Sequence, residues 1–303
     1  MFCKGQLVEL QRDLPVLQRA GLGLAVISYD STAVLADFAS RKGITFPLLS
    51  DHESVVIRAF GVEDRRYGKE AAIDVDSSGA VPVYGIPYSA VFVLRPDGIV
   101  HWRFVSEHEE LRFTGNSILE RSLGAMVSES RRPLEVGKLQ VVATASNSLT
   151  GLGTRLNIGL ELRLPRGWHV YSPQVTGGYR GITWQMDASE CSIIGDVVYP
   201  APHWKQLAFS SEKLPVYEGT LRLTRELIIK PLLNDSNPAV FQLFRKSCLD
   251  SAPRFQASGS LQFQACDERE CFPPQSIPLE WKFDFLAPDR RRVPVRLWRA
   301  FEH

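Results

Sequence analysis

The sequence predicts two domains of different classes, an α/β domain followed by an all-β domain. With 303 residues, the chain has room for two domains of ordinary size. In the first half, apolar residues at helical spacing alternate with short apolar runs, a pattern typical of α/β proteins. In the second half, apolar and polar residues alternate over short segments separated by turn residues, and no long helical period appears.

The first half opens with a helix. Four leucines share one helical face, which predicts a helix over residues 4–20, with a kink at Pro15. A buried strand over residues 24–29 follows. Ser31 can cap the N-terminus of a second helix, and Gly43 can close its C-terminus. Together these elements predict a helix-strand-helix order for the first part of the domain.

The remaining elements of this half are short. We expect, in order, a strand near residues 46–49, a short helix ending at Gly61, a polar insert over 62–84, a hairpin of strands 89–94 and 99–104, and a helix over 116–126. Pro96 and Gly98 favour the hairpin turn, because proline presets φ and glycine accepts positive φ. The resulting order is β-α-β-α-β-β-α without its first strand, an α/β pattern.

Several segments of this half resemble the AhpC/TSA peroxiredoxin-like family. The matching stretches read "CKGQLVELQRDLP", "GLAVISYDS", "ITFPLLSD", "VIRAFGV" and "GIPYSAVFVLRPDGIV". The resemblance implies a thioredoxin-like fold for residues 1–127. It also implies that Pro87 corresponds to a proline that is usually cis and faces the active-site cysteine, so Pro87 is a candidate substrate-binding residue.

The start of the chain departs from this family. Cys3 is followed by Lys4 and a helix, which matches the second cysteine of a Cys-x-x-Cys site, whereas a peroxidatic cysteine is usually followed by proline. The nucleophilic cysteine and the strand before it would then lie upstream of Met1. We expect the true start to lie upstream, and one route to a late start is a selenocysteine codon read as a stop. Peroxidase activity would require that upstream residue.

Cys3 has two interpretations. At a helix N-terminus beside Lys4, the helix dipole and the lysine favour a thiolate, which makes Cys3 a candidate catalytic residue. Alternatively, Cys3 is a resolving cysteine that has no partner within this chain.

The second half predicts a β-sandwich with an immunoglobulin-like pattern. Residues 128–138 are polar and charged and are interpreted as a linker. The expected strands are 139–145, 154–164, 181–186, 192–198, 220–229, 254–264 and 277–285, within a domain over 139–286. Residues 287–303 carry Arg290, Arg291, Arg292 and Trp298 and are expected to form a loosely attached basic tail.

The stretch "ACDERECFPP" places Cys266 and Cys271 at facing ends of two strands, on either side of a polar turn. A hairpin brings two such Cα atoms to roughly 4.4–6.8 Å, the range a disulfide needs. Because the loop is short, the bond would stabilise the fold by only about 2 kcal/mol, which suits a reversible bond better than a structural one. A static hairpin disulfide stays an alternative. A zinc site is disfavoured, since no second Cys or His pair stands at suitable spacing.

This stretch and its surroundings resemble the N-terminal periplasmic domain of the thiol:disulfide interchange protein DsbD. The supporting segments are "LRLPRGWHVYSP", "GITWQM", "VVYPAPHW", "PVYEGTLRLT" and "IPLEW", and the resemblance covers about residues 134–286. It implies that Cys266 and Cys271 cycle between dithiol and disulfide, with Cys271 as the attacking thiol. Four residues separate the two cysteines here, where the best-known members have five.

The resemblance adds candidates near the cysteine pair. Phe209 lies close to the position of an aromatic cap loop that shields the disulfide, and Tyr171 matches a tyrosine near the site, so both are candidate substrate-binding residues. His169 stands two residues before Tyr171 and is interpreted as an ordinary strand histidine. Cys191 and Cys248 have no motif around them and are interpreted as small buried hydrophobes or free thiols, with their mutual pairing left open.

The composition favours no nucleic-acid or membrane-surface function. The net charge is +1, from 35 basic and 34 acidic residues, and no apolar run is long enough to cross a membrane. No cofactor or metal is expected. The expected partner is a thioredoxin-like redox protein or a membrane electron donor. A working disulfide favours an exported, periplasmic location if the true N-terminus carries a signal, and a cytoplasmic location otherwise.

These observations predict a thiol-disulfide oxidoreductase that passes electrons through the Cys266–Cys271 pair and is coupled to the first domain. The alternative is a non-catalytic β-sandwich interaction module with a static disulfide and an inactive, truncated redox domain. The electron donor, the target and the oligomeric state cannot be read from the sequence.

Overall fold

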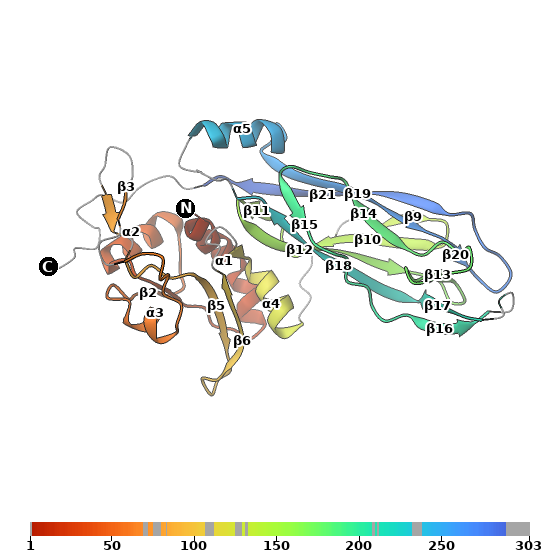
Figure 1. Ribbon diagram of the computed structural model, residues 1–303, viewed down its shortest axis with the longest axis horizontal. Coiled ribbons are helices and arrows are strands. Elements are labelled where there is room, and N and C mark those ends of the chain that lie inside the picture. Colours follow the sequence, from red (N-terminus) through yellow and green to blue (C-terminus); the bar gives the residue numbers. More distant parts are fainter. Residues whose placement is uncertain are drawn as a thin grey trace. The chain divides into compact units, whose positions relative to one another are not determined.

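The computed structural model describes most of the chain (Figure 1). The described residues are 2–68, 72–74, 80–82, 84–106, 112–124, 129–130, 133–207, 210, 212–231 and 238–288. The chain divides into two compact units. The first unit comprises Met1–Met126, Gly151–Thr154 and Ala287–His303, and the second comprises Val127–Thr150 and Arg155–Leu286. No helix among the described residues is long and apolar enough to span a membrane.

The first unit has α/β composition, as the sequence predicts. Its elements are α1 (Phe2–Arg19), β1 (Val26–Ser28), α2 (Thr32–Lys42), β2 (Leu48–Ser50), α3 (Val55–Ala59), β3 (Ala72–Asp74), β4 (Ala80–Pro82), β5 (Ser89–Leu94), β6 (Val100–Ser106), β7 (Arg112–Phe113) and α4 (Gly115–Leu123). Helix α1 continues through Pro15. The Ser31 hydroxyl accepts a hydrogen bond from the Val34 amide at 3.3 Å, and Gly43 closes α2 with φ of 66°. Both predicted caps are therefore confirmed.

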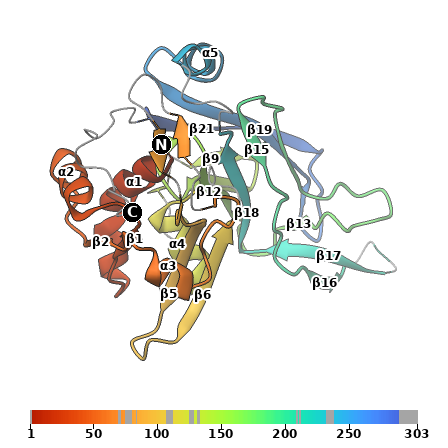
Figure 2. The same cartoon turned by 60° about the vertical axis from the view of Figure 1, so that its left-hand side comes forward.

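Six of the described strands of this unit form three small pairs, and Figure 2 labels the strands β1, β2, β5 and β6 of two of them, whereas β7 pairs with β12 (Thr154–Arg163). Strands β1 and β2 are parallel, and β5 and β6 form the predicted antiparallel hairpin. Strands β3 and β4 form a further antiparallel pair within the stretch expected to be a polar insert. The core between helices and strands contains Leu10, Leu14, Phe38, Ile44, Phe46, Val93, Phe113 and Ile118.

The second unit is rich in strands. Its elements are β8 (Glu129–Ser130), β9 (Leu134–Val136), β10 (Leu139–Ala145), β11 (Leu149–Gly151), β12 (Thr154–Arg163), β13 (His169–Tyr171), β14 (Thr183–Met186), β15 (Ser192–Ile194), β16 (His203–Gln206), β17 (Lys213–Glu218), β18 (Thr220–Ile229), α5 (Pro238–Cys248), β19 (Arg254–Phe263), β20 (Ala265–Cys266) and β21 (Gln275–Leu286). Each of the seven predicted strands has a counterpart here.

Three sheets organise these strands. One sheet follows the order β15-β18-β12-β10-β8, with β9 also paired to β10; a second follows β11-β21-β19-β14; a third follows β16-β17-β13-β20. Strand β21 alternates buried and exposed residues, because one of its faces lies in the core and the other in solvent. Trp281 of β21 is fully buried, and its indole N–H donates a 2.9 Å hydrogen bond to the Thr144 carbonyl of β10. This bond ties the first two sheets together.

The structure corrects two expectations for this half. The stretch 128–138, interpreted as a linker, contains β8 and β9, which pair with β10 because their backbone groups continue its ladder. Helix α5 was not expected. Phe241 and Phe244 pack against Phe285 of β21, so tertiary contacts stabilise this helix. The residues of the proposed basic tail beyond 288, with Arg290–Arg292 and Trp298, lie outside the described part of the chain.

Candidate functional site

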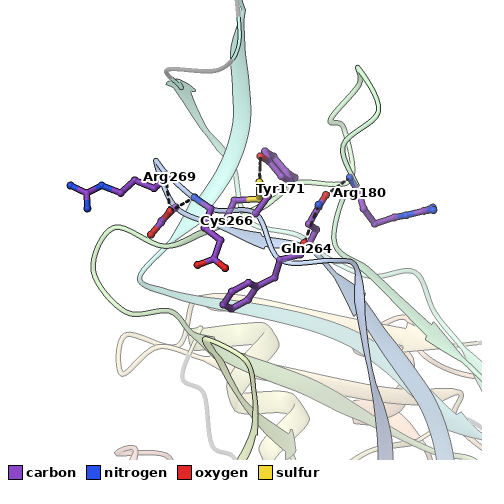
Figure 3. Close-up of a disulfide and its surroundings, with 9 residues drawn as sticks. Tyr171, Arg180, Gln264, Cys266 and Arg269 are labelled. Atoms are coloured by element: carbon purple, nitrogen blue, oxygen red, sulfur yellow. Dashed lines mark hydrogen bonds between the residues drawn. A yellow bond between two sulfur atoms is a disulfide. The ribbon is translucent and has the colours of Figure 1, made fainter.

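The candidate site is built on the small sheet β16-β17-β13-β20. Strand β20 pairs antiparallel with β13, so Cys266 lies opposite His169 and Ala265 lies opposite Val170. On its other edge β13 pairs with β17, which places Tyr171 opposite Val216. The cysteine pair therefore sits at the edge of a sheet with a buried core behind it (Figure 3).

Cys266 and Cys271 form a disulfide, as predicted from the hairpin pattern. Their Cα atoms are 4.1 Å apart, and the two residues also form an isolated antiparallel bridge. The two sulfur-bearing residues differ in exposure, since Cys266 is 0% exposed whereas Cys271 is an exposed residue. A partner protein can reach Cys271 far more readily than Cys266.

Asp267 organises the turn between the two cysteines. Its Oδ1 accepts hydrogen bonds from the Arg269 and Glu270 amides, each at 2.7 Å, and its own amide donates to the Glu270 carbonyl at 2.8 Å. An aspartate that bonds its own following backbone is a common stabiliser of tight turns. The same amide hydrogen bonds lower the pKa of Asp267, because they stabilise its carboxylate.

Further hydrogen bonds anchor the base of the hairpin. The Gln264 side chain donates to the Phe272 carbonyl at 3.1 Å and accepts from the Arg180 amide at 3.2 Å (Figure 3). The Phe272 amide donates to the Ala265 carbonyl at 3.0 Å, and the Phe272 ring lies 4.9 Å from the Trp168 ring. The chain on both sides of the disulfide is thus held in place, so opening the S–S bond need not unfold the hairpin.

Tyr171 points its hydroxyl at the disulfide (Figure 3). The Tyr171 hydroxyl donates to the Cys266 sulfur at 3.5 Å and lies 3.8 Å from the Cys271 sulfur. Burial, together with nearby Tyr179, raises the pKa of Tyr171 to about 12, so this hydroxyl keeps its proton at neutral pH. Tyr171 and Cys266 share a buried cluster with Leu207, Leu214 and Val216. Tyr171 is thus fixed as a hydrogen-bond donor beside both sulfurs.

His169 is the residue near the disulfide whose significance the sequence did not reveal. It is fully buried on β13, and its ring packs edge-on against Tyr171 with centroids 5.3 Å apart. Burial is the main cause that lowers its pKa, with a smaller contribution from Lys205. The histidine was interpreted as an ordinary strand residue, because its position opposite Cys266 depends on a strand pairing that spans almost a hundred residues.

The other predicted site residues lie elsewhere. Phe209 is outside the described residues. Pro87 lies in the first unit, where it bridges to Glu63 in an extended pairing. The described residues contain no cis peptide bond, so the cis form implied for Pro87 is not observed. Hydrogen bonds from the backbone amides of Tyr88 and Asp64 join the segment around Pro87 to the segment around Glu63. The trans form of a peptide bond before proline is the intrinsically favoured one.

Cys3 is an exposed free cysteine in the first turn of α1. The buried side chain of Arg112, on β7, donates a hydrogen bond to its sulfur at 3.1 Å. The predicted neighbour was Lys4, whereas Arg112 is 109 positions away in the sequence and could not be predicted from it. Cys3 and the Cys266–Cys271 pair belong to different units.

For Cys191 and Cys248 the structure contradicts the interpretation as free thiols and bears out the mutual pairing that the sequence left open. The two residues are half-buried and form a second disulfide, with Cα atoms 5.8 Å apart. Cys191 immediately precedes β15, and Cys248 ends α5. No local motif marks this pair, since 57 positions separate the two cysteines and α5 was not expected. Among the described residues, no cluster of three or more His, Cys, Asp or Glu side chains could hold a metal ion.

The structure thus places a disulfide beside a buried tyrosine in the second unit and an α/β arrangement in the first. Comparison with known families follows the same division. Residues 1–103 match the model of the AhpC/TSA family, and residues 138–278 match the model of the N-terminal part of the thiol:disulfide interchange protein DsbD. Both resemblances predicted from the sequence motifs are confirmed.

Two relatives match the first half. A Mycobacterium tuberculosis protein described as a peroxiredoxin is 35% identical over 89 residues, covering 27% of this chain and 57% of its own length. Peroxiredoxin Bcp of Xanthomonas campestris is 33% identical over 107 residues, covering 34% of this chain and 59% of its own length. The chain therefore spans less than two thirds of the length of the curated relatives it matches.

Solved structures resemble both halves. The N-terminal periplasmic domain of ScsB from Proteus mirabilis has a TM-score of 0.32 at 20% identity, covering 52% of each chain. The reduced DsbD N-terminal domain of Neisseria meningitidis has a TM-score of 0.26 at 14% identity, covering 41% of this chain and 74% of its own. Enterococcus faecalis AhpC has a TM-score of 0.29 at 23% identity, covering 36% of this chain and 57% of its own.

Proposed function

We propose that this protein is a thiol-disulfide oxidoreductase that transfers two electrons through the Cys266–Cys271 pair. The observation that carries the proposal is the asymmetry of the disulfide: Cys271 is exposed, whereas Cys266 is buried beneath the Tyr171 hydroxyl. An exchange protein needs one sulfur that a partner can attack and a second sulfur that is protected from other thiols. This pair meets both needs.

In the reductive direction, a thiolate of a dithiol partner attacks the Cys271 sulfur. The Cys266–Cys271 bond breaks, the partner becomes joined to Cys271, and Cys266 leaves as a thiolate that takes up a proton. The second thiolate of the partner then attacks the partner sulfur that is bonded to Cys271, and this attack releases Cys271. The partner ends as a disulfide and the hairpin as a dithiol, so two electrons and two protons have been transferred.

The reverse direction oxidises the hairpin. The Cys271 thiolate attacks a disulfide in a target protein, and Cys266 then attacks Cys271 to release the reduced target. Tyr171 supports both directions, because its protonated hydroxyl can donate a hydrogen bond to whichever sulfur carries negative charge. This assignment makes Cys271 the sulfur that contacts partners, Cys266 the resolving sulfur and Tyr171 the donor that stabilises the thiolate.

The expected partners are thioredoxin-like redox proteins. The similarity to the DsbD N-terminal domain supports this class, since that protein is named for thiol:disulfide interchange. We propose that the AhpC/TSA-like unit is a second redox station on the same chain, in which Cys3 is the reactive residue and Arg112 stabilises negative charge on its sulfur.

The test is the reduction potential of the Cys266–Cys271 pair, measured by thiol trapping and mass spectrometry across a glutathione or dithiothreitol series. A Cys191→Ala/Cys248→Ala variant serves as the matched control, because it leaves the hairpin pair as the single disulfide described here. A reversible couple between about −180 and −270 mV is expected for an exchange protein. A couple well below about −300 mV would establish a structural bond and favour a non-catalytic interaction module.

A further inference from the structure

The sheet that carries the hairpin disulfide also carries a buried histidine that the exchange described above leaves unused. His169 is 0% exposed, and the β13–β20 register places it opposite Cys266, which is also 0% exposed. Residues directly opposite each other in an antiparallel pair have Cβ atoms about 4.5–5.5 Å apart on the same face of the sheet. His169 and Cys266 therefore lie directly opposite each other, with their Cβ atoms on the same face of the sheet.

The imidazole has unused hydrogen-bonding capacity. Neither Nδ1 nor Nε2 of His169 has a hydrogen-bond partner among the described residues, although both atoms are buried. Its ring instead packs edge-on against Tyr171, whose hydroxyl is directed at the sulfurs. Buried polar groups in folded proteins almost always have a partner, and the exceptions often have a catalytic or redox role. A histidine kept without a partner beside a redox-active sulfur needs such an explanation.

The surroundings of His169 favour its neutral form. Glu218 lies opposite it on β17 and forms an ion pair with Lys205 of β16 at 2.7 Å, while Asp267 and Glu268 lie just beyond β20. Burial lowers the pKa of His169 and Lys205 lowers it further, whereas the three carboxylates act in the opposite direction. Because its pKa is lowered from the ordinary histidine value, the neutral imidazole is favoured at pH 7 and has a free lone pair for a proton.

We propose that His169 is the base that accepts the Cys266 thiol proton when the hairpin disulfide re-forms. This proposal rests on the proposed function and identifies the proton acceptor of its resolving step. The Cys266 thiol passes its proton to the imidazole while its sulfur attacks Cys271, the bond between Cys271 and the partner breaks, and the partner leaves as a thiolate. The imidazolium then gives the proton to that thiolate or to water. In the opposite direction, the imidazolium protonates Cys266 as it leaves.

The test uses the full chain in the reduced state with oxidised glutathione as the partner disulfide. Samples are quenched with acid between pH 5 and pH 9, and mass spectrometry follows the glutathione adduct of Cys271 as Cys266 resolves it. In His169→Gln we expect resolution at pH 7 to slow by a factor of about 10² or more, the usual contribution of a positioned base. The midpoint of the pH-rate profile should also rise toward the value of an ordinary thiol, about 8.5.

His203→Gln is the matched control. His203 lies on β16 of the same sheet but is exposed, so the same substitution there should leave the profile unchanged. A His169→Gln variant with an intact fold and the pH profile of the unmodified protein would overturn the proposal. Hairpin cysteines that never react with glutathione would instead refute the proposed function, and this inference with it.

A second measurement needs no variant. NMR titration of His169 in the unmodified protein gives its pKa in the oxidised and the reduced states. If His169 exchanges a proton with Cys266, its pKa should differ between the two states, because the reduced site adds a thiol that titrates together with the imidazole. Equal values in both states would overturn the proposal even if His169→Gln fails to fold.

Discussion

Replacing Tyr171 with phenylalanine removes one hydroxyl from the site and keeps the buried ring. In the reduced protein this hydroxyl would donate to a thiolate, and hydrogen bonds to charged groups are worth about 1.5–3 kcal/mol. In the oxidised protein the same hydroxyl lies 3.5 Å from a neutral disulfide sulfur, a weaker acceptor worth about 0.5–1 kcal/mol. Removing the hydroxyl should therefore destabilise the reduced form relative to the oxidised form by about 1–2 kcal/mol.

For a two-electron couple, 1.4 kcal/mol corresponds to about 30 mV, so Tyr171→Phe should make the potential about 20–45 mV more negative. The glutathione titration described above measures this shift. Tyr217→Phe is the control, because Tyr217 is buried on β17 of the same sheet but donates its hydrogen bond to the Pro200 carbonyl at 2.9 Å. An unchanged potential in Tyr171→Phe, or an equal shift in both variants, would refute the assigned role.

Two further predictions concern the disulfides and the turn. Cys191→Ala/Cys248→Ala should lower the free energy of unfolding, measured in urea, by about 4 kcal/mol, and Cys266→Ala/Cys271→Ala should lower it by about 2 kcal/mol. The first loss is larger because 57 positions separate that pair of cysteines, whereas 5 separate the hairpin pair. Equal losses would contradict this reasoning. Asp267→Ala should speed opening of the hairpin disulfide by a phosphine reductant. The pKa of Asp267 is lowered in the folded protein, so its carboxylate stabilises the turn at pH values above the ordinary pKa of 3.8. This stabilisation is lost as the pH falls through the folded pKa. The variant and the unmodified protein should therefore react alike in strong acid.

Local patterns predicted much of the fold. The caps Ser31 and Gly43 and the hairpin of β5 and β6 depend on a few neighbouring residues, and the structure has all of them. Strands β19 and β21 were predicted because their alternation follows a buried face. Helix α5 was missed although Asn237 before Pro238 is a helix-start signal, and its contacts with Phe285 come from a distant strand. The sandwich packing and the domain boundaries stay predictions.

In the candidate site, too, the features set by neighbouring residues were predicted and those set by distant contacts were missed. Cys266, Cys271 and the polar turn were predicted because all of their determinants lie within ten residues. The structure brings Tyr171 to both sulfurs, as its resemblance to a site tyrosine suggested. His169 and the Cys191–Cys248 bond required the register of strands and the position of a helix, which no single-sequence pattern contains.

The two disulfides of the second unit suit opposite tasks. The Cys191–Cys248 bond joins segments 57 residues apart, so opening it would release a large loop with α5 at its end and cost considerable stability. The Cys266–Cys271 bond closes a turn that Asp267 and Gln264 already hold in place, so opening it changes little beyond the sulfurs themselves. A disulfide can exchange repeatedly only if the fold does not depend on it. This argument supports the proposal that the hairpin pair is the reactive one, with the long-range bond stabilising the domain during exchange.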